Sequence, residues 1–307
     1  SFPTRRSSDL RQGIVMNGIF NVLKPSGMTS HDVVAFLRRA LHTKKIGHGG
    51  TLDPDAAGVL PVFAGNATRL LEFAVEGKKQ YIAEFTLGKR TDTGDDSGTV
   101  VEEKAVPTIT AEQLRQTLDS FLGVQQQLPP MYSALKVDGK KLYELARKGI
   151  EVERKPREIE IYQLELLHFT ENSFTVAVDC SKGTYIRVLG EDIAAALGTC
   201  GTMSFLLRTR VGSYTLADAY TLQEIAANPE ECRAESISAV ADLPTLKLTG
   251  RQAARITNGV RTTIAGTADG RYVLLGPGEE FLGLGICSES MIKAEKILEH
   301  YQMPEEE

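Results

Sequence analysis

Residues 45–61 bring together the side chains of this chain that are best suited to chemistry. His48 stands five residues before Asp53, and the stretch also holds four glycines and two prolines. Glycines permit backbone geometries that other residues disfavour, and Pro54 restricts Asp53 to extended conformations. We therefore predict a rigid loop that presents the Asp53 carboxylate at one fixed place, where it could act as a nucleophile or a general base.

Taken alone, Asp53 allows two other interpretations. A single aspartate in a turn is most often a turn former or a helix cap. Asp55 follows two residues later, and an Asp-x-Asp pattern is typical of aspartate-based phosphatases that use magnesium. Such enzymes need further acidic ligands and a hydrophobic strand before the first aspartate, whereas residues 47–52 are rich in glycine. The phosphatase is therefore the weaker hypothesis.

The hydrophobic pattern indicates which elements position this loop. A helix capped by Thr29 is predicted before it, because Val33, Leu37 and Leu41 share one helical face. An apolar strand is predicted after it at residues 59–64. Further strands are predicted at residues 19–23, 81–87, 159–169, 174–180 and 203–214, and further helices at residues 66–75, 110–121, 138–148 and 186–197. This irregular order of strands and helices favours an α+β fold.

Four more motifs follow the loop along the chain. They are Lys79-Gln80-Tyr81 and residues 88–93 (GKRTDT), 129–136 (PPMYSALK) and 180–187 (CSKGTYIR). Together with the loop, they resemble the TruB family, the pseudouridine synthases that modify the T-arm of transfer RNA. The resemblance is strong over residues 18–214. Several separate motifs in the right order argue against coincidence.

The resemblance implies an isomerase that converts a uridine in the T-loop of tRNA, conventionally position 55, to pseudouridine. The reaction breaks the C1′–N1 bond, turns the uracil over and rejoins it through C5, so we expect no cofactor and no metal. Asp53 matches the family's essential aspartate, which either adds covalently to the sugar or base or abstracts a sugar proton. A non-catalytic tRNA-binding or folding factor on the same scaffold is the alternative from another class.

The resemblance adds two residues to the catalytic group. Tyr81 matches an aromatic residue that stacks on the target uracil, and stacking holds an extruded base without demanding one base identity. Arg187 matches the arginine that pairs with the catalytic aspartate, so it would keep Asp53 ionised. From alternation alone, Tyr81 would be interpreted as a core residue of a strand.

Four residues are predicted to bind the substrate on the same basis. Tyr185 and Leu207 match residues that line the uracil pocket, although both could be ordinary core. Lys79 should lie on the same sheet face as Tyr81, because strand side chains repeat every second residue; otherwise it would be a solubilising charge at a sheet edge. His48 could transfer protons, but the resemblance assigns it to holding the base-extruded RNA loop.

The formal net charge of −5 argues at first against a nucleic-acid partner, because phosphate neutralisation by Lys and Arg dominates such binding. A local positive face can nevertheless coexist with an acidic total. Basic residues gather at residues 38–39, 44–45, 78–79, 136–148 and 154–157. We expect the stretch from Lys136 to Arg157 to contact the RNA backbone.

The chain shows no sign of membrane insertion or secretion. It has no uninterrupted apolar run of about 18 residues and no signal-peptide pattern, so we expect a cytoplasmic protein. Its four cysteines are far apart and form no C-x-x-C pair, which argues against a zinc site and a disulfide framework. No extra apolar helix face stands out, so we expect a monomer.

Three segments are predicted along the 307 residues. Residues 1–15 are polar and precede Met16, and we interpret them as a non-native or disordered leader. Residues 16–241 form the predicted pseudouridine synthase domain, with a central mixed, mainly antiparallel sheet flanked by helices. Residues 242–307 combine a predicted helix at 251–258 with short strands at 272–275 and 281–287, and they resemble a PUA-type RNA-binding domain followed by an acidic tail.

Overall fold

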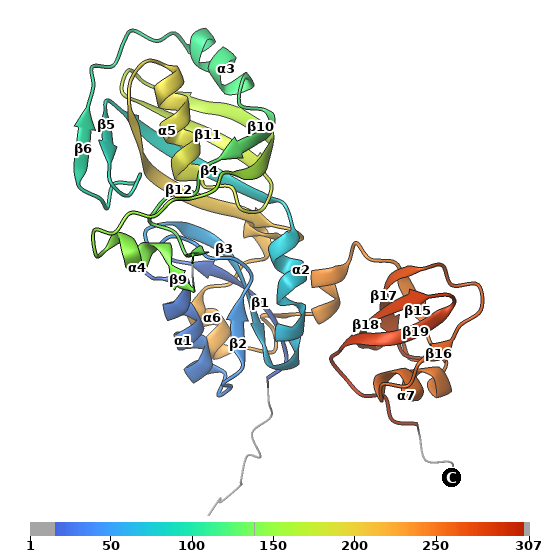
Figure 1. The fold of residues 1–307 in the computed structure, drawn as a ribbon. Coiled ribbons are helices and arrows are strands. Elements are labelled where there is room, and N and C mark those ends of the chain that lie inside the picture. The colour runs from blue at the N-terminus through green and yellow to red at the C-terminus, as the bar shows by residue number, and fades with distance from the viewer. Residues whose placement is uncertain (1–15, 138, 304–307) are drawn as a thin grey trace, which may run out of the picture.

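The computed structural model describes residues 16–137 and 139–303. Figure 1 shows a larger α+β part and a smaller β-rich part at the C-terminal end. The main path of the large sheet runs through β14 (Arg233–Ala234), β1 (Gly18–Lys24), β3 (Ala57–Ala64), β12 (Gly201–Val211), β4 (Lys79–Leu87), β11 (Ser173–Cys180), β10 (Arg157–Phe169) and β7 (Gly123–Gln127). Two further strands lie off this path, β2 (Ile46–His48) on β3 and β13 (Tyr214–Thr215) on β12.

This sheet is mixed and mainly antiparallel. The pair of β3 and β12 is parallel, whereas β12, β4, β11 and β10 follow one another in antiparallel pairs. Because β3 carries the end of the site loop and β12 comes much later in the chain, this pairing brings distant motifs together. The predicted α+β fold is confirmed.

Two helices cover the N-terminal half of the sheet. The helix α1 (Ser30–Ala40) begins as predicted at Thr29, whose side chain accepts a hydrogen bond from the backbone of Asp32 while Asp32 caps Thr29 in return. The helix α6 (Leu222–Ala227) was not predicted, although Thr221 and Glu224 form the same capping box. Both helices pack on the apolar side chains of β1 and β3.

Two other helices cover the second half of the sheet. They are α3 (Ala111–Asp119), which lies within the predicted helix at residues 110–121 and begins at a capping box of Thr110 and Gln113, and α5 (Ile186–Ala196). Side chains of β4 alternate between buried and half-buried, which confirms the predicted strand. Gly190 of α5 lies against Phe85, where a Cβ atom would come within 2.0 Å of the ring, so a glycine is needed for this close approach. Phe85 also contacts Phe174 across the strands, with ring centroids 5.1 Å apart.

Two predictions of secondary structure were wrong. A basic helix was predicted at residues 138–148, of which 138 lies outside the described residues. The structure instead has a hairpin of β8 (Lys136–Val137) and β9 (Lys140–Lys141), because Gly139 adopts φ +79° in a tight turn, and then the short helix α4 (Leu142–Ala146).

The second error concerns the start of the helix predicted at residues 66–75, where Asn66 was expected to be the cap and is not. A 3-10 helix, η1 (Gly65–Leu70), begins one residue earlier and continues into α2 (Leu71–Glu76). The Asn66 side-chain amide donates instead to the backbone oxygen of Leu298, 3.0 Å away. This partner lies in the C-terminal part of the chain, which local sequence patterns cannot reveal.

A hairpin and three short elements complete the larger part. The hairpin pairs β5 (Lys89–Thr91) with β6 (Val100–Glu103), and its connecting residues reach the site described below. The short elements are the 3-10 helices η2 (Leu216–Asp218) and η3 (Ser236–Val240), together with the bridge of Asp95 to Met203.

The C-terminal part is a five-stranded sheet with one helix, α7 (Gly250–Thr257). Its strand order is β15 (Thr245–Lys247), β17 (Gly270–Leu275), β18 (Phe281–Ser288), β19 (Met291–Ile297) and β16 (Thr262–Thr263). Its Val273, Leu284 and Leu298 join one hydrophobic cluster with Ile19 and Phe63 of the larger part.

The limits of the three predicted segments stay predictions. The leader at residues 1–15 and the acidic end of the tail, residues 305–307, lie outside the described residues. Among the helices that are described, none is long and apolar enough to cross a membrane.

Candidate active site

The loop that carries Asp53 runs between β2 and β3 and is anchored by the buried side chain of Lys24. Lys24, fully buried at the end of β1, donates from Nζ to the backbone oxygens of Pro25 (2.8 Å), Pro54 (3.0 Å) and Ala56 (2.6 Å). Burial lowers the pKa of Lys24 to about 8. The ammonium group therefore holds the loop residues that follow Asp53 against the end of β1, which agrees with the predicted rigid loop.

The N-terminus of α1 supplies a second anchor for this loop. The Ser30 hydroxyl accepts a hydrogen bond from the Leu52 backbone N–H (2.9 Å) and lies 3.2 Å from the Leu52 oxygen. Leu52 itself is buried in the core beside Ala56. As a result, Asp53 stands between two fixed neighbours, and its own side chain is 33% exposed.

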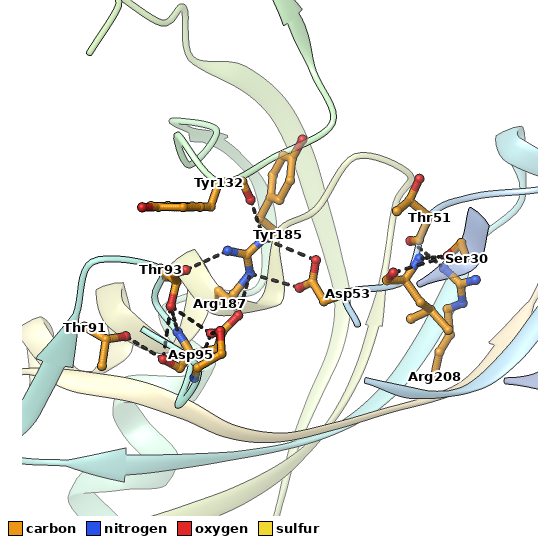
Figure 2. Close-up of polar contacts among 12 residues, drawn as sticks. Ser30, Thr51, Asp53, Thr91, Thr93, Asp95, Tyr132, Tyr185, Arg187 and Arg208 are labelled. Atoms are coloured by element: carbon orange, nitrogen blue, oxygen red, sulfur yellow. Dashed lines mark hydrogen bonds and ion pairs between the residues drawn. The ribbon is translucent and has the colours of Figure 1, made fainter. Parts of the chain in front are cut away.

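Arg187 meets the Asp53 carboxylate from the first turn of α5. Its Nε lies 3.0 Å from Oδ2 and its Nη2 donates to Oδ1 at 3.3 Å, so one edge of the guanidinium faces both carboxylate oxygens (Figure 2). The remaining donors reach the backbone oxygens of Thr93 (2.6 Å) and Tyr132 (2.8 Å). Arg187 is only 4% exposed, so three separate segments fix its position.

Asp95, which was not among the predicted site residues, also belongs to this group. Its Oδ2 lies 3.8 Å from Arg187 Nε. Its other oxygen accepts hydrogen bonds from the hydroxyls of Thr93 (2.7 Å) and Ser97 (2.5 Å). The signal available in the sequence was its place directly after the GKRTDT motif, but only the fold shows that this turn meets α5.

Tyr81 and Lys79 lie on one face of β4, as their spacing predicted, and the Asp53 charge acts on Tyr81. Tyr81 is 7% exposed, and burial raises its pKa to about 12. Burial likewise lowers the pKa of Lys79 to about 8. The partner of Tyr81 in the sheet register is Arg208 of β12, a buried cation that sequence reasoning missed.

Comparisons with known proteins agree with this geometry. The family described as TruB family pseudouridylate synthase (N terminal domain) matches residues 38–186, and the tRNA pseudouridylate synthase B C-terminal domain matches residues 187–243. The tRNA pseudouridine synthase B of Symbiobacterium thermophilum is 49% identical over 81% of this chain and 84% of that one. The chain belongs to the TruB family. It is therefore an isomerase, a pseudouridine synthase.

Two further comparisons support the assignment over the full length. The tRNA pseudouridine synthase B of Caldanaerobacter subterraneus subsp. tengcongensis is 44% identical over 92% of this chain and 99% of that one. A chain from the crystal structure of a Cbf5-Nop10-Gar1 complex superposes with a TM-score of 0.72 at 25% identity, covering 94% of this chain and 87% of that chain. The family predicted from the motifs is thereby confirmed.

In this pseudouridine synthase site, the pKa of the Asp53 carboxyl differs from expectation. Burial raises the pKa of the Asp53 carboxyl, and Arg187 opposes this rise while Asp95 adds to it. Arg187 thus favours the ionised form, as predicted, but desolvation outweighs it. A carboxylate that is costly to ionise is a stronger base than an exposed aspartate.

The remaining predicted residues of the TruB-family site, Tyr185, His48 and Leu207, lie in three different positions. Tyr185 precedes α5, and Gln127 accepts a hydrogen bond from its backbone N–H (2.8 Å) and donates to its oxygen (3.1 Å). Figure 2 shows its ring beside Arg187. His48 is half-buried at the end of β2, where burial lowers its pKa, so the imidazole is neutral near pH 7.

Leu207 is the predicted residue that the structure does not bring to this group. Across the sheet it pairs with Ile82, whereas Arg208 pairs with Tyr81. Directly opposed residues of antiparallel strands point to the same face and neighbours along a strand point to opposite faces. The side chain of Leu207 therefore lies on the face away from Tyr81.

The site offers little support for the phosphatase hypothesis. Asp55 is exposed, next to the buried Ala56. Within residues 16–137 and 139–303, no group of three or more His, Cys, Asp or Glu side chains is arranged to hold a metal ion. The four cysteines are separate, reduced and buried.

Proposed function

We propose that this protein converts the uridine at position 55, in the T-loop of tRNA, to pseudouridine, with Asp53 as the catalytic carboxylate. The family acts on uridine in tRNA. The observation that carries the residue assignment is the bidentate contact between Arg187 and Asp53, at 3.0 and 3.3 Å, beside the buried ring of Tyr81.

In the proposed reaction, the C1′–N1 bond of the uridine breaks, and the uracil rotates and forms a C1′–C5 bond. C5 then loses its proton and N1 gains one, so the atoms balance without a cofactor. Asp53 serves either as a nucleophile toward the sugar or base or as the base that removes a sugar proton. Arg187 orients its two oxygens in either route, because the guanidinium contacts both.

The freed base must be held while it turns. Tyr81 and Tyr185 supply aromatic surfaces near the Asp53–Arg187 pair, and stacking tolerates rotation of a flat base. A uracil leaves the sugar with negative charge on the ring, and Lys79 would stabilise this charge from the face of Tyr81. His48, neutral and half-buried, would contact the RNA loop by packing.

The RNA backbone would be bound by the basic stretch from Lys136 to Arg157. Within it, Lys141 and Arg147 each lie 5.4 Å from the centre of the Tyr143 ring. This arrangement presents two cations with one aromatic face, which suits phosphates and unpaired bases. The PUA-like C-terminal part would add contacts farther along the tRNA. Monomeric state and cytoplasmic location stay predictions.

The test is incubation of the protein with an unmodified T-arm hairpin, followed by carbodiimide mapping of pseudouridine. We expect one new pseudouridine in the loop with the wild-type protein and none with Asp53→Asn, whereas RNA binding persists. Asp55→Asn is the matched control, because Asp55 is a neighbouring but exposed carboxylate. It should keep full activity.

Each alternative predicts a different result. A binding or folding factor would bind the hairpin and produce no pseudouridine. An Asp-x-Asp phosphatase would need both Asp53 and Asp55 and would lose activity in EDTA. Turnover that survives in Asp53→Asn would remove Asp53 from the mechanism even if the T-loop is the correct target.

A further inference from the structure

Arg208 is a large charged side chain with almost no access to water. It is 1% exposed and lies on β12 beside Tyr81 of β4. In the described part of the chain, no carboxylate forms an ion pair with it; Asp53 is a carboxylate whose charge acts on it without such a contact. A buried cation without a paired anion is costly. An apolar side chain could fill this space at lower cost, so a purely architectural role explains the arginine poorly.

The donors of Arg208 all point toward the site loop. Its Nη2 donates to the backbone oxygen of Gly50 (3.0 Å), its Nη1 to that of Thr51 (3.3 Å) and its Nε to that of Val59 (2.8 Å). These acceptors stand before and after Asp53. One rigid guanidinium therefore ties both ends of the loop to β12, as Figure 2 shows for Thr51.

Arg208 is also the direct cross-strand partner of Tyr81 between β12 and β4, and each of the two side chains shifts the pKa of the other. The Tyr81 ring and the Asp53 loop come from different strands of the sheet, and Arg208 lies next to both. Its planar fork has five donors in fixed directions, whereas an ammonium group offers three on a flexible stem. This geometry suits a side chain that must hold several groups at fixed distances from one another.

We propose that Arg208 is a positioning residue for the isomerisation, one that fixes the distance between the Tyr81 ring and the Asp53 carboxylate. This rests on the proposed roles of Asp53 and Tyr81. The base rotates after its first bond to C1′ breaks and before the new bond forms. During this rotation, the ring that stacks on the base and the carboxylate must keep a constant distance from each other. Small displacements of such groups are expensive, with losses of about 100-fold for a shift of about 1 Å.

The experiment compares Arg208→Lys, Arg208→Met and Tyr81→Phe with the wild type. Arg208→Lys keeps the charge and loses the fork, and Arg208→Met removes both. Single-turnover rates, RNA dissociation constants and melting temperatures are measured for each. Arg210→Lys is the matched control, because Arg210 lies two residues farther along β12, is exposed and donates from Nε to the backbone oxygen of Gly212 (2.7 Å).

We expect Arg208→Lys to lower the single-turnover rate about 10-fold to 100-fold while RNA affinity and the melting temperature change little. The Arg210→Lys control should match the wild type. In the Tyr81→Phe background, where the hydroxyl group is already absent, the added effect of Arg208→Lys should be smaller than in the wild type, because residues that share one interaction are not additive.

Three results would overturn the proposal. They are a wild-type rate in Arg208→Lys, a rate loss that only follows lost RNA binding or thermal stability, and equal effects of Arg208→Lys in both backgrounds. If Arg208→Met does not fold, Arg208→Lys and its double-mutant cycle with Tyr81→Phe still test the proposal. Inactivity of the wild type itself would instead contradict the proposed function, so the two failures are distinct.

Discussion

Replacing Arg187 by methionine should raise the pKa of the Asp53 carboxyl and shift the pH profile of the reaction. Breaking a buried ion pair by removing one partner costs about 3 to 5 kcal/mol. Asp53 is 33% exposed, so screening by water reduces this to about 2 kcal/mol. At about 1.36 kcal/mol per pH unit, the pKa should rise by about 1.5 units.

The direction of the shift follows from the proposed role of Asp53. The carboxylate is the active form, so activity is lost as pH falls through its pKa. Burial already places this pKa above the ordinary value for aspartate, and Arg187 opposes that rise. Without Arg187 the acid limb of the single-turnover profile should therefore move to higher pH by about 1.5 units, and the plateau should also fall because the carboxylate is no longer oriented.

The assay is a series of single-turnover measurements between pH 4.5 and 9, with saturating protein and a labelled T-arm hairpin. Arg90→Met is the matched control, since Arg90 forms a partly exposed ion pair with Glu102 (2.8 Å) on the hairpin of β5 and β6. It should leave the profile unchanged. An acid limb that stays in place in Arg187→Met, or moves to lower pH, would show that Arg187 does not act on the ionisation of Asp53.

Two further predictions concern the backbone around the site. Lys24→Met should lower turnover about 10-fold or more, because the oxygens of Pro54 and Ala56 lose their buried partner; faster amide exchange in residues 53–56 should accompany the loss, and unchanged exchange would contradict this reason. Gly58→Ala should destabilise the fold by about 3 kcal/mol or more in urea unfolding, since φ is +115° and the new Cβ would lie 2.1 Å from the Arg208 oxygen. Gly27→Ala, at φ +84° with no atom within 4 Å, should cost only about 1 kcal/mol, and equal losses in the two variants would refute the steric argument.

Much of the local structure could be predicted because it depends on neighbours a few residues apart. The capping boxes at Thr29 and Thr110 begin α1 and α3 as the sequence patterns indicate. Alternation along β4 places Lys79 and Tyr81 on one face. Where two local signals conflict, the prediction was wrong. The basic stretch before Lys148 has a helical pattern, but the turn at Gly139 places the first residues of that stretch in a hairpin.

The burial of two cations is the feature of the structure that the sequence predicted least well. Lysine and arginine are almost always exposed, so nothing near Lys24 or Arg208 indicates that each is fully buried under the site. Their burial is possible because backbone oxygens of the loop accept their hydrogen bonds. Which oxygens become available depends on how β1, β3 and β12 pack.

The sequence by itself determined the family and led to the proposal of Asp53 in a rigid loop as the catalytic carboxylate, because these inferences depend on continuous motifs and on the backbone preferences of glycine and proline. Only the tertiary structure decided how the site is assembled. Asp53 and Arg187 are 134 residues apart, and Asp95 joins them from a third segment. The order of strands in the sheet brings these segments together, and their common burial then sets the ionisation of the carboxylate, a property of the packed molecule that no single segment carries.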